Sequence, residues 1–123
     1  MKNDDTMPVE LHTIAPFDQC SVRVLRAMAP HVDRIRVRSG TVLAREGREP
    51  KEFIAVLSGQ ITSSRRGNHV GVNGAGTQIG GAALVDRQPH DATWEALTDL
   101  EVLVVNGPAY RWVWQTAGRS AAA

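Results

Sequence analysis

Short apolar runs separated by glycine-containing turns dominate the middle of this chain. The clearest is Phe53-Ile54-Ala55-Val56-Leu57, which is closed by Ser58-Gly59. A run of this length is too short to stand alone as a helix, and its unbroken apolar character is typical of a strand that is buried on both faces. We therefore expect a central β-strand here, in a fold built mainly from β-structure.

Further strands are expected on both sides of this run. The segments 60–64 and 70–72 flank the polar sequence Arg65-Arg66-Gly67-Asn68, which is typical of a solvated hairpin tip. The remaining expected strands lie within residues 32–37, 42–43, 92–96 and 100–105. Turn signals that recur every eight to twelve residues or so favour a β-sandwich or barrel. The pattern predicts an eight-stranded β-roll or jelly-roll barrel.

Helices are expected at the two ends of the β region. Apolar residues recur at helical spacing over Asp18–Met28, with Asp18 as the expected N-cap, Cys20 as a packed helix residue and Pro30 as a stop. Gly107-Pro108 introduces a short terminal helix over 109–115. A chain of 123 residues suits one core. We expect a mobile lead-in over 1–10, one domain over 11–116 and a flexible tail over 117–123.

Composition excludes several classes of protein. The formal net charge of +1 provides no field that would attract nucleic acid. Cys20 is the only cysteine, so an intrachain disulfide and a cysteine zinc cluster are excluded, and a reducing cytoplasm is the expected location. No apolar run is long enough for a signal peptide or a membrane span.

Motifs of catalysis are also missing. The sequence holds no nucleophile elbow, no Walker glycine loop and no recognisable pair of acidic residues. Its histidines occur singly, without the paired spacing of metal ligands. These residues are His12, His31, His69 and His90. We therefore expect neither an enzyme nor a metal site, and an enzyme of the cupin-like barrels would need a metal-binding histidine set that this sequence does not supply.

A series of small motifs carries a family resemblance. In chain order it comprises Gly40, Glu46-Gly47, Phe53, Leu57-Ser58-Gly59, Gly76, Ile79-Gly80-Gly81-Ala82-Ala83-Leu84, Ala92-Thr93 and Ala96-Leu97-Thr98-Asp99. This order resembles the cyclic-nucleotide-binding domains of catabolite activator proteins, regulatory kinase subunits and gated channels, and the resemblance covers residues 11 to 116. It implies a β-roll with a short helix inside a phosphate-binding cassette, for which the counterpart here is Ile79 to Trp94.

The cassette can also be interpreted from physical principles. A glycine-rich turn that opens a helix points backbone amides outward, and such amides attract anions. The candidate ligand-binding residues are Gly80, Gly81, Ala82, Ala83, Leu84, Arg87, His90, Asp91 and Ala92. The competing interpretation of the glycines is close packing around a turn, and that of Arg87 and His90 is an ordinary exposed loop.

The cassette departs from the family pattern at three positions. Gly81 stands where the resemblance implies a glutamate that binds the ribose, His90 where it implies an arginine for the phosphate, and Asp91 where it implies a small hydroxyl residue. Hydrogen bonds to charged groups contribute about 1.5 to 3 kcal/mol each, so two losses remove about two to four decades of affinity. Asp91 adds repulsion toward a phosphate. Trp94 replaces a smaller aliphatic residue and is expected to reshape or fill the pocket.

Two functional hypotheses follow. The first is a non-catalytic regulatory module that binds cyclic AMP and cyclic GMP weakly or not at all and acts through an unidentified protein partner. The second is a small-molecule sensor that binds a cyclic nucleotide or another anion through residues 80–83 with His90 or Arg87. The resemblance implies a lid helix, for which little or no sequence is left after Trp114. Trp112 and Trp114 cannot both face one way, so an exposed tryptophan there favours docking to a partner or to an absent lid.

Overall fold

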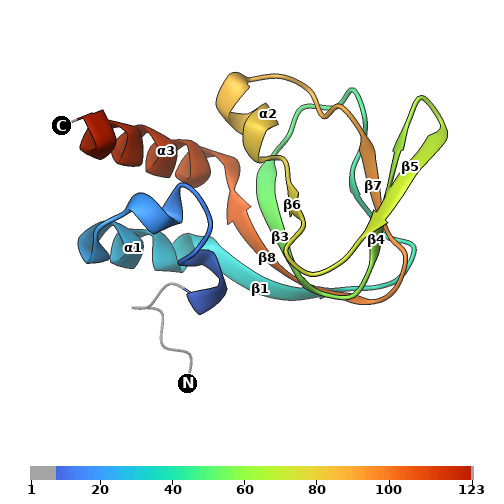
Figure 1. The fold of residues 1–123 in the computed structure, drawn as a ribbon, viewed down its shortest axis with the longest axis horizontal. Coiled ribbons are helices and arrows are strands. Elements are labelled where there is room, and N and C mark those ends of the chain that lie inside the picture. Colours follow the sequence, from blue (N-terminus) through green and yellow to red (C-terminus); the bar gives the residue numbers. More distant parts are fainter. Residues whose placement is uncertain (1–7, 123) are drawn as a thin grey trace.

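Two four-stranded antiparallel sheets form the body of the protein (Figure 1). The computed structural model describes residues 8–122, with side chains described through Ala117. The first sheet has the order β1 (Val32–Val37), β8 (Leu100–Asn106), β3 (Glu52–Ser58), β6 (Gln78–Ile79). The second has the order β2 (Val42–Ala44), β7 (Thr93–Ala96), β4 (Ile61–Arg65), β5 (Asn68–Asn73). The expected eight-stranded β-roll is confirmed, although the two sheets do not close into a barrel.

Strand β3 is the buried centre that its sequence predicts. Its alternate side chains divide between two clusters of buried residues. Phe53 and Ala55 pack with helical residues, whereas Ile54 and Val56 pack between the sheets. This alternation follows from the period of two along a strand. An unbroken apolar run was needed because both faces of β3 are covered.

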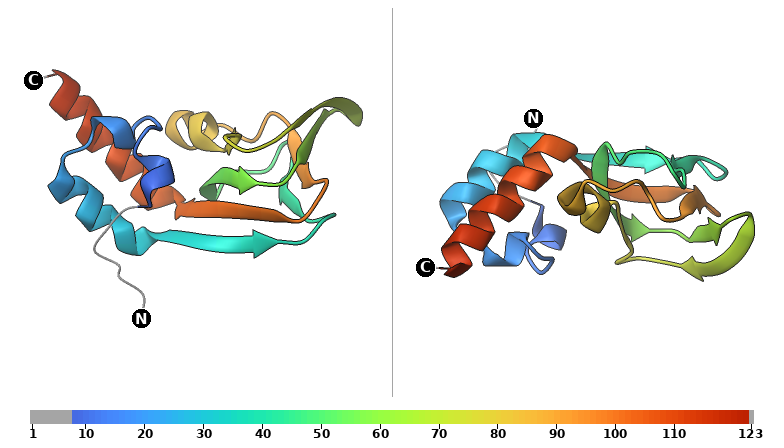
Figure 2. Two further views of the ribbon diagram at one scale, coloured as in Figure 1. Left: turned by 60° about the horizontal axis from the view of Figure 1, so that its bottom comes forward. Right: turned by 90° about the horizontal axis from the view of Figure 1, so that it is seen from above.

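Helices gather at one end of the roll (Figure 1). Helix α1 (Val22–Met28) runs beside α3 (Gly107–Ala122), and three 3-10 turns complete this layer (Figure 2). These turns are η1 (Val9–Leu11), η2 (Phe17–Gln19) and η3 (Ala29–His31). Phe17, Phe53 and Tyr110 form the aromatic centre of the layer, and the rings of Phe53 and Tyr110 stack with centroids 4.5 Å apart.

The start of the first helix differs from the expectation. Asp18 lies in η2, and Ser21 is the N-cap of α1, where its Oγ accepts a hydrogen bond from the Val24 amide at 3.3 Å. Cys20 has extended backbone and precedes the helix, so its assignment as a helix residue is wrong. Its Sγ instead donates to the Pro16 carbonyl at 3.3 Å. Apolar spacing alone could not separate the 3-10 turn from the helix.

The last helix is longer than expected. It begins at Gly107 and continues to Ala122, beyond the predicted 109–115, through residues that the sequence analysis assigned to a tail. Alanine has the highest intrinsic helix propensity, which favours this extension. At its start the Asn106 Oδ1 accepts from the Ala109 amide at 2.8 Å, a cap that the prediction missed.

Glu10, near the start of the described residues, is bound to the first strand. Residues 1–7 of the predicted lead-in and Ala123 of the predicted tail lie outside the described residues. Within the lead-in, Glu10 belongs to η1 and forms an ion pair with Arg34 at 3.0 Å. Among the helices described, none is both long and apolar enough to span a bilayer.

Candidate functional site

The predicted cassette begins where β6 meets a tight turn. Gly80 has a φ of +89° and precedes helix α2 (Gly81–Asp86), whose first intrahelical bond runs from the Leu84 amide to the Gly80 carbonyl at 2.9 Å. A Cβ at Gly80 would lie 2.7 Å from the Glu52 carbonyl oxygen on β3. Glycine is therefore required here both by the left-handed backbone and by the close approach of a neighbouring strand.

Gly81 is required for a different reason. A Cβ built at this position would lie 2.7 Å from the Tyr110 hydroxyl oxygen and 3.5 Å from Phe53 Cδ1. Tyr110 is 3% exposed and is held by its stacking on Phe53, so a side chain at residue 81 would require the phenol ring to shift. The position at which the resemblance implies a glutamate is thus closed to a side chain by helix α3.

The Tyr110 hydroxyl supplies no charge to the cassette. Burial raises the pKa of Tyr110 above its usual value of 10.0, and a side-chain hydrogen bond with Trp114 opposes this shift. The phenol is therefore neutral at physiological pH. It can donate or accept a hydrogen bond with a ligand, but it cannot supply the negative charge of a carboxylate.

His90 lies at the end of the cassette loop and is tied to the loop between β2 and β3. Its amide donates to the Arg48 carbonyl and its carbonyl accepts from the Gly47 amide, both at 2.9 Å. Desolvation by partial burial lowers the pKa of His90 below 6.5, against the opposing effect of Asp91. A neutral imidazole at pH 7 cannot act as the fixed cation that an arginine provides.

Asp91 forms an ion pair that the sequence analysis did not foresee. Arg65 Nη2 lies 3.0 Å from Asp91 Oδ2, and the Arg65 side chain stays well exposed beside the hairpin turn, as its sequence predicts. The β4–β7 register aligns Ser64 with Thr93, and this pairing carries Arg65 toward Asp91. The neighbouring Arg66 amide donates to Glu46 Oε1 at 2.8 Å. The negative charge of Asp91 is therefore partly offset by a cation from another strand.

A cavity of about 720 Å³ lies beside these groups. Its lining includes the first turn of α2, His90, Asp91, Trp94, Tyr110 and Trp114. Trp94 forms part of the cavity wall and leaves the space open, so it does not fill the pocket. The volume falls within the usual range for small-molecule sites.

A strand, a glycine turn, a short helix and a return strand around a cavity make up this site. Residues 34–117 match the model of the family described as "Cyclic nucleotide-binding domain". The chain belongs to the cyclic nucleotide-binding domain family. The resemblance found in the sequence is thereby confirmed.

Among curated proteins, the chain is similar to the cGMP-dependent protein kinase egl-4 of Caenorhabditis briggsae and of Caenorhabditis elegans. Each is 29% identical over 84 residues, which cover 68% of this chain and 11% of the kinase. The chain thus corresponds to a small part of these relatives.

Solved structures share the fold at low sequence identity. The C-linker/CNBHD of zELK channels, crystallized in the presence of cAMP, has a TM-score of 0.80 at 22% identity and covers 94% of this chain and 60% of that one. The sensor domain of the transcriptional regulator DNR from Pseudomonas aeruginosa has a TM-score of 0.77 at 18% identity, covering 92% and 86%. A cyclic nucleotide-binding-like protein from Brucella abortus has 0.75 at 24%, covering 86% and 95%.

The other predicted site residues of this cyclic nucleotide-binding domain are not all brought to the cavity. Leu84 and Ala92 are buried, at 1% and 2% exposure, and they serve packing. Arg87 is the C-cap of α2 with a φ of +55°, and it lines a separate groove with Pro50 and Arg111. Of the two candidate cations, only His90 therefore lines the cassette cavity. Within the described residues, no cluster of three potential metal ligands occurs.

Proposed function

We propose that this chain is a non-catalytic regulatory module that binds cyclic AMP and cyclic GMP weakly or not at all and acts through contacts with a protein partner. The observation that carries the proposal is the close approach of the Tyr110 hydroxyl oxygen to Gly81. A ligand's ribose finds a neutral phenol there in place of a carboxylate. The start of the cassette helix therefore packs against α3, and this packing takes the place of a side chain that would bind the ribose.

The charges around the cavity support the same proposal. His90 is neutral at pH 7, and Asp91 adds a carboxylate to the lining of the cassette cavity. Arg65 is already paired with Asp91, so a phosphate would have to compete for it. Because both members of this pair are well exposed, their interaction is weak, but the carboxylate still repels an anion.

Contact with a protein partner is supported by helix α3. Trp112 and Trp114 are 41% and 37% exposed, although tryptophan is normally well buried. Exposed tryptophans are enriched at the energetic centres of protein interfaces. The curated relatives are kinases in which the matching segment is a small part, which fits a domain that works on other segments.

The direct test is a titration of cyclic AMP and of cyclic GMP, with the amide chemical shifts of residues 80–91 as the readout. We expect no saturable shift below millimolar ligand. Saturable shifts confined to these residues at micromolar ligand would overturn the proposal.

A gain-of-function variant makes this test two-sided. The double substitution His90→Arg with Asp91→Ser restores a fixed cation and removes the carboxylate, and one charged hydrogen bond corresponds to about one to two decades of affinity. We expect measurable binding of cyclic AMP in this variant, and a further gain when Gly81→Glu is combined with Tyr110→Phe. Arg87→Gln, in a different groove, is the matched control and should leave binding unchanged. If the restored variant gains nothing, the cassette differences are not the reason for weak binding.

A second candidate function is a sensor of another small molecule, because the cavity of about 720 Å³ remains open and is walled by Trp94, Tyr110 and Trp114. A ligand that binds the folded state raises its melting temperature by mass action. We expect such a ligand to shift the amides of residues 80–91 as well. A thermal-shift screen followed by that measurement separates the two functions.

A further inference from the structure

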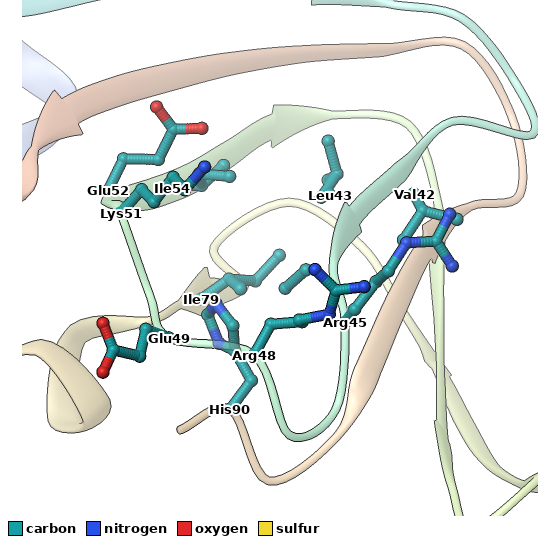
Figure 3. Close-up of a pocket in the computed structure, with 11 residues that line it drawn as sticks. Val42, Leu43, Arg45, Arg48, Glu49, Lys51, Glu52, Ile54, Ile79 and His90 are labelled. Carbon is teal, nitrogen blue, oxygen red and sulfur yellow. The ribbon is translucent and has the colours of Figure 1, made fainter. Parts of the chain in front are cut away.

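A second cavity lies between the two sheets, at the loop that joins β2 to β3. Its volume is about 440 Å³, and it shares only His90 and Ile79 with the cassette cavity. Figure 3 shows the residues that line it, which come from β2, the following loop, the start of β3, and β6. It is therefore a distinct site, and its chemistry differs from that of the cassette.

The floor of this cavity is aliphatic. Val42 and Leu43 on β2 line it together with Ile54 on β3 and Ile79 on β6. Ile54 and Ile79 are 3% and 2% exposed, so they form a firm base rather than a mobile rim. None of these four floor residues carries an aromatic ring, and the imidazole of His90 lines the cavity beside them. The floor suits a short hydrocarbon body and offers no stacking surface for a nucleobase.

Cations dominate the rim above this floor. In Figure 3 the guanidinium groups of Arg45 and Arg48 both extend from the loop over the same side of the cavity, whereas the Glu49 carboxylate turns away from the floor residues. Within residues 8–117, neither guanidinium has a side-chain hydrogen bond or an ion pair. Two neighbouring arginines without partners are a ready site for a carboxylate, which arginine binds with paired hydrogen bonds.

Backbone hydrogen bonds hold the arginine loop in place. The Arg48 amide donates to the Arg45 carbonyl at 3.1 Å, and the Gly47 amide and the Arg48 carbonyl both bond to His90 at 2.9 Å. At the far end of the loop, the Lys51 carbonyl accepts from the Gly107 amide at 2.9 Å. The loop is thus anchored at both ends, which lowers the ordering cost of binding a ligand.

We propose that this groove binds a small monoanionic carboxylate, with its head between Arg45 and Arg48 and its short hydrocarbon body on Ile54 and Ile79. Glu49 and Glu52 on the rim disfavour a ligand of higher negative charge. The site is separate from the cassette, and the inference does not depend on the proposed function.

Hexanoate is the first probe, with hexanamide as its neutral isostere and acetate as the head group alone. We expect hexanoate to give saturable amide shifts at residues 42–44 and at Ile54 at millimolar concentration, consistent with the small binding energy available to so few atoms. Hexanamide and acetate should each bind at least about tenfold more weakly, because hexanamide lacks the negative charge and acetate lacks the hydrocarbon body. Equal binding of hexanamide, or shifts confined to residues 81–83, would overturn the proposal.

Substitutions identify the head-group contacts. The double variant Arg45→Gln with Arg48→Gln should weaken hexanoate binding by about tenfold or more, since charge-assisted hydrogen bonds are lost. The matched control is Arg23→Gln with Arg26→Gln, which removes the same charge from α1 in the helical layer and should leave binding unchanged. Unaltered binding in the Arg45 and Arg48 variant would show that these side chains do not hold the head group. An equal loss in the control would reduce the effect to net charge. Either outcome would overturn the site.

Discussion

The two faces of strand β3 have different surroundings. Phe53 and Ala55 on one face are sealed beneath helices α1 and α3, and their cluster includes several side chains with 0% exposure. Ile54 on the other face contributes to a core between the sheets, but it also forms the floor of an open groove. One face therefore holds the fold together, whereas the other leaves room for ligands.

Helix α3 links these two regions, and it belongs to both. Tyr110 stacks on Phe53 within the sealed layer, and its hydroxyl oxygen closes the position of Gly81 in the cassette. A residue recruited for packing therefore sets a limit on the binding site. Substitutions on either side of Tyr110 can separate the two roles.

The largest effect is expected from Phe53→Ala. Phe53 is fully buried between Phe17 and Tyr110, and truncation of a buried phenylalanine costs about 3–5 kcal/mol. Trp94→Ala removes a larger side chain, but one that is only partly buried against the core between the sheets and also borders the cavity, so we expect a smaller loss of about 1–3 kcal/mol. Urea unfolding of the two variants measures both values. Equal losses would mean that the cavity side is as tightly packed as the helical layer.

The next effect concerns Gly81→Ala. Alanine is favoured over glycine in a helix by about 1 kcal/mol, but overpacking against the Tyr110 hydroxyl costs about 1–3 kcal/mol. We expect net destabilisation of the single variant. In a Tyr110→Phe background the nearest ring atoms lie at 3.5 Å, so the same substitution should become neutral or stabilising. A double-mutant cycle by urea unfolding tests this reversal, and additive effects would show that the hydroxyl group is not the obstacle.

A smaller effect is expected at the Arg65–Asp91 pair. Both side chains are well exposed, at 58% and 82%, and exposed ion pairs contribute about 1 kcal/mol or less. Arg65→Gln and Asp91→Asn should each reduce the free energy of unfolding slightly, and the coupling between them should fade as salt is added. A coupling free energy well above about 1 kcal/mol would show that the ion pair fixes the cassette loop to the β4–β5 hairpin.

The sequence predicted the sealed face of β3 better than the open one. The Phe53–Leu57 run was enough to predict a strand covered on both sides, because burial of apolar side chains is a local pattern. The family motifs also placed the cassette turn and its short helix. The helix start at Ser21 and the extent of α3 were missed because local capping competes with periodicity there.

The long-range contacts that shape the candidate site could not be predicted from the sequence. The pairing of Arg65 with Asp91 depends on the register of β4 with β7, and the closure of Gly81 depends on a residue in α3 that is distant along the chain. Neither follows from neighbouring residues. The β2–β3 loop that carries the arginines of the groove is likewise held by backbone hydrogen bonds to His90, which is distant along the chain.

The smallest effect is a dependence of stability on pH that His90 introduces at the boundary of the two cavities. Burial lowers the pKa of His90 in the folded state below its ordinary 6.5, so the unfolded chain binds more protons as the pH falls through about 6.5. The contribution of neutral His90 to the free energy of unfolding is therefore complete above pH 6.5. It is lost progressively as the pH falls from there toward the pKa of His90 in the folded state. His90→Gln should flatten the pH profile of urea unfolding in this window. An NMR titration of the His90 ring checks the cause directly. A ring pKa at or above 6.5 would show that burial does not govern the protonation of this imidazole.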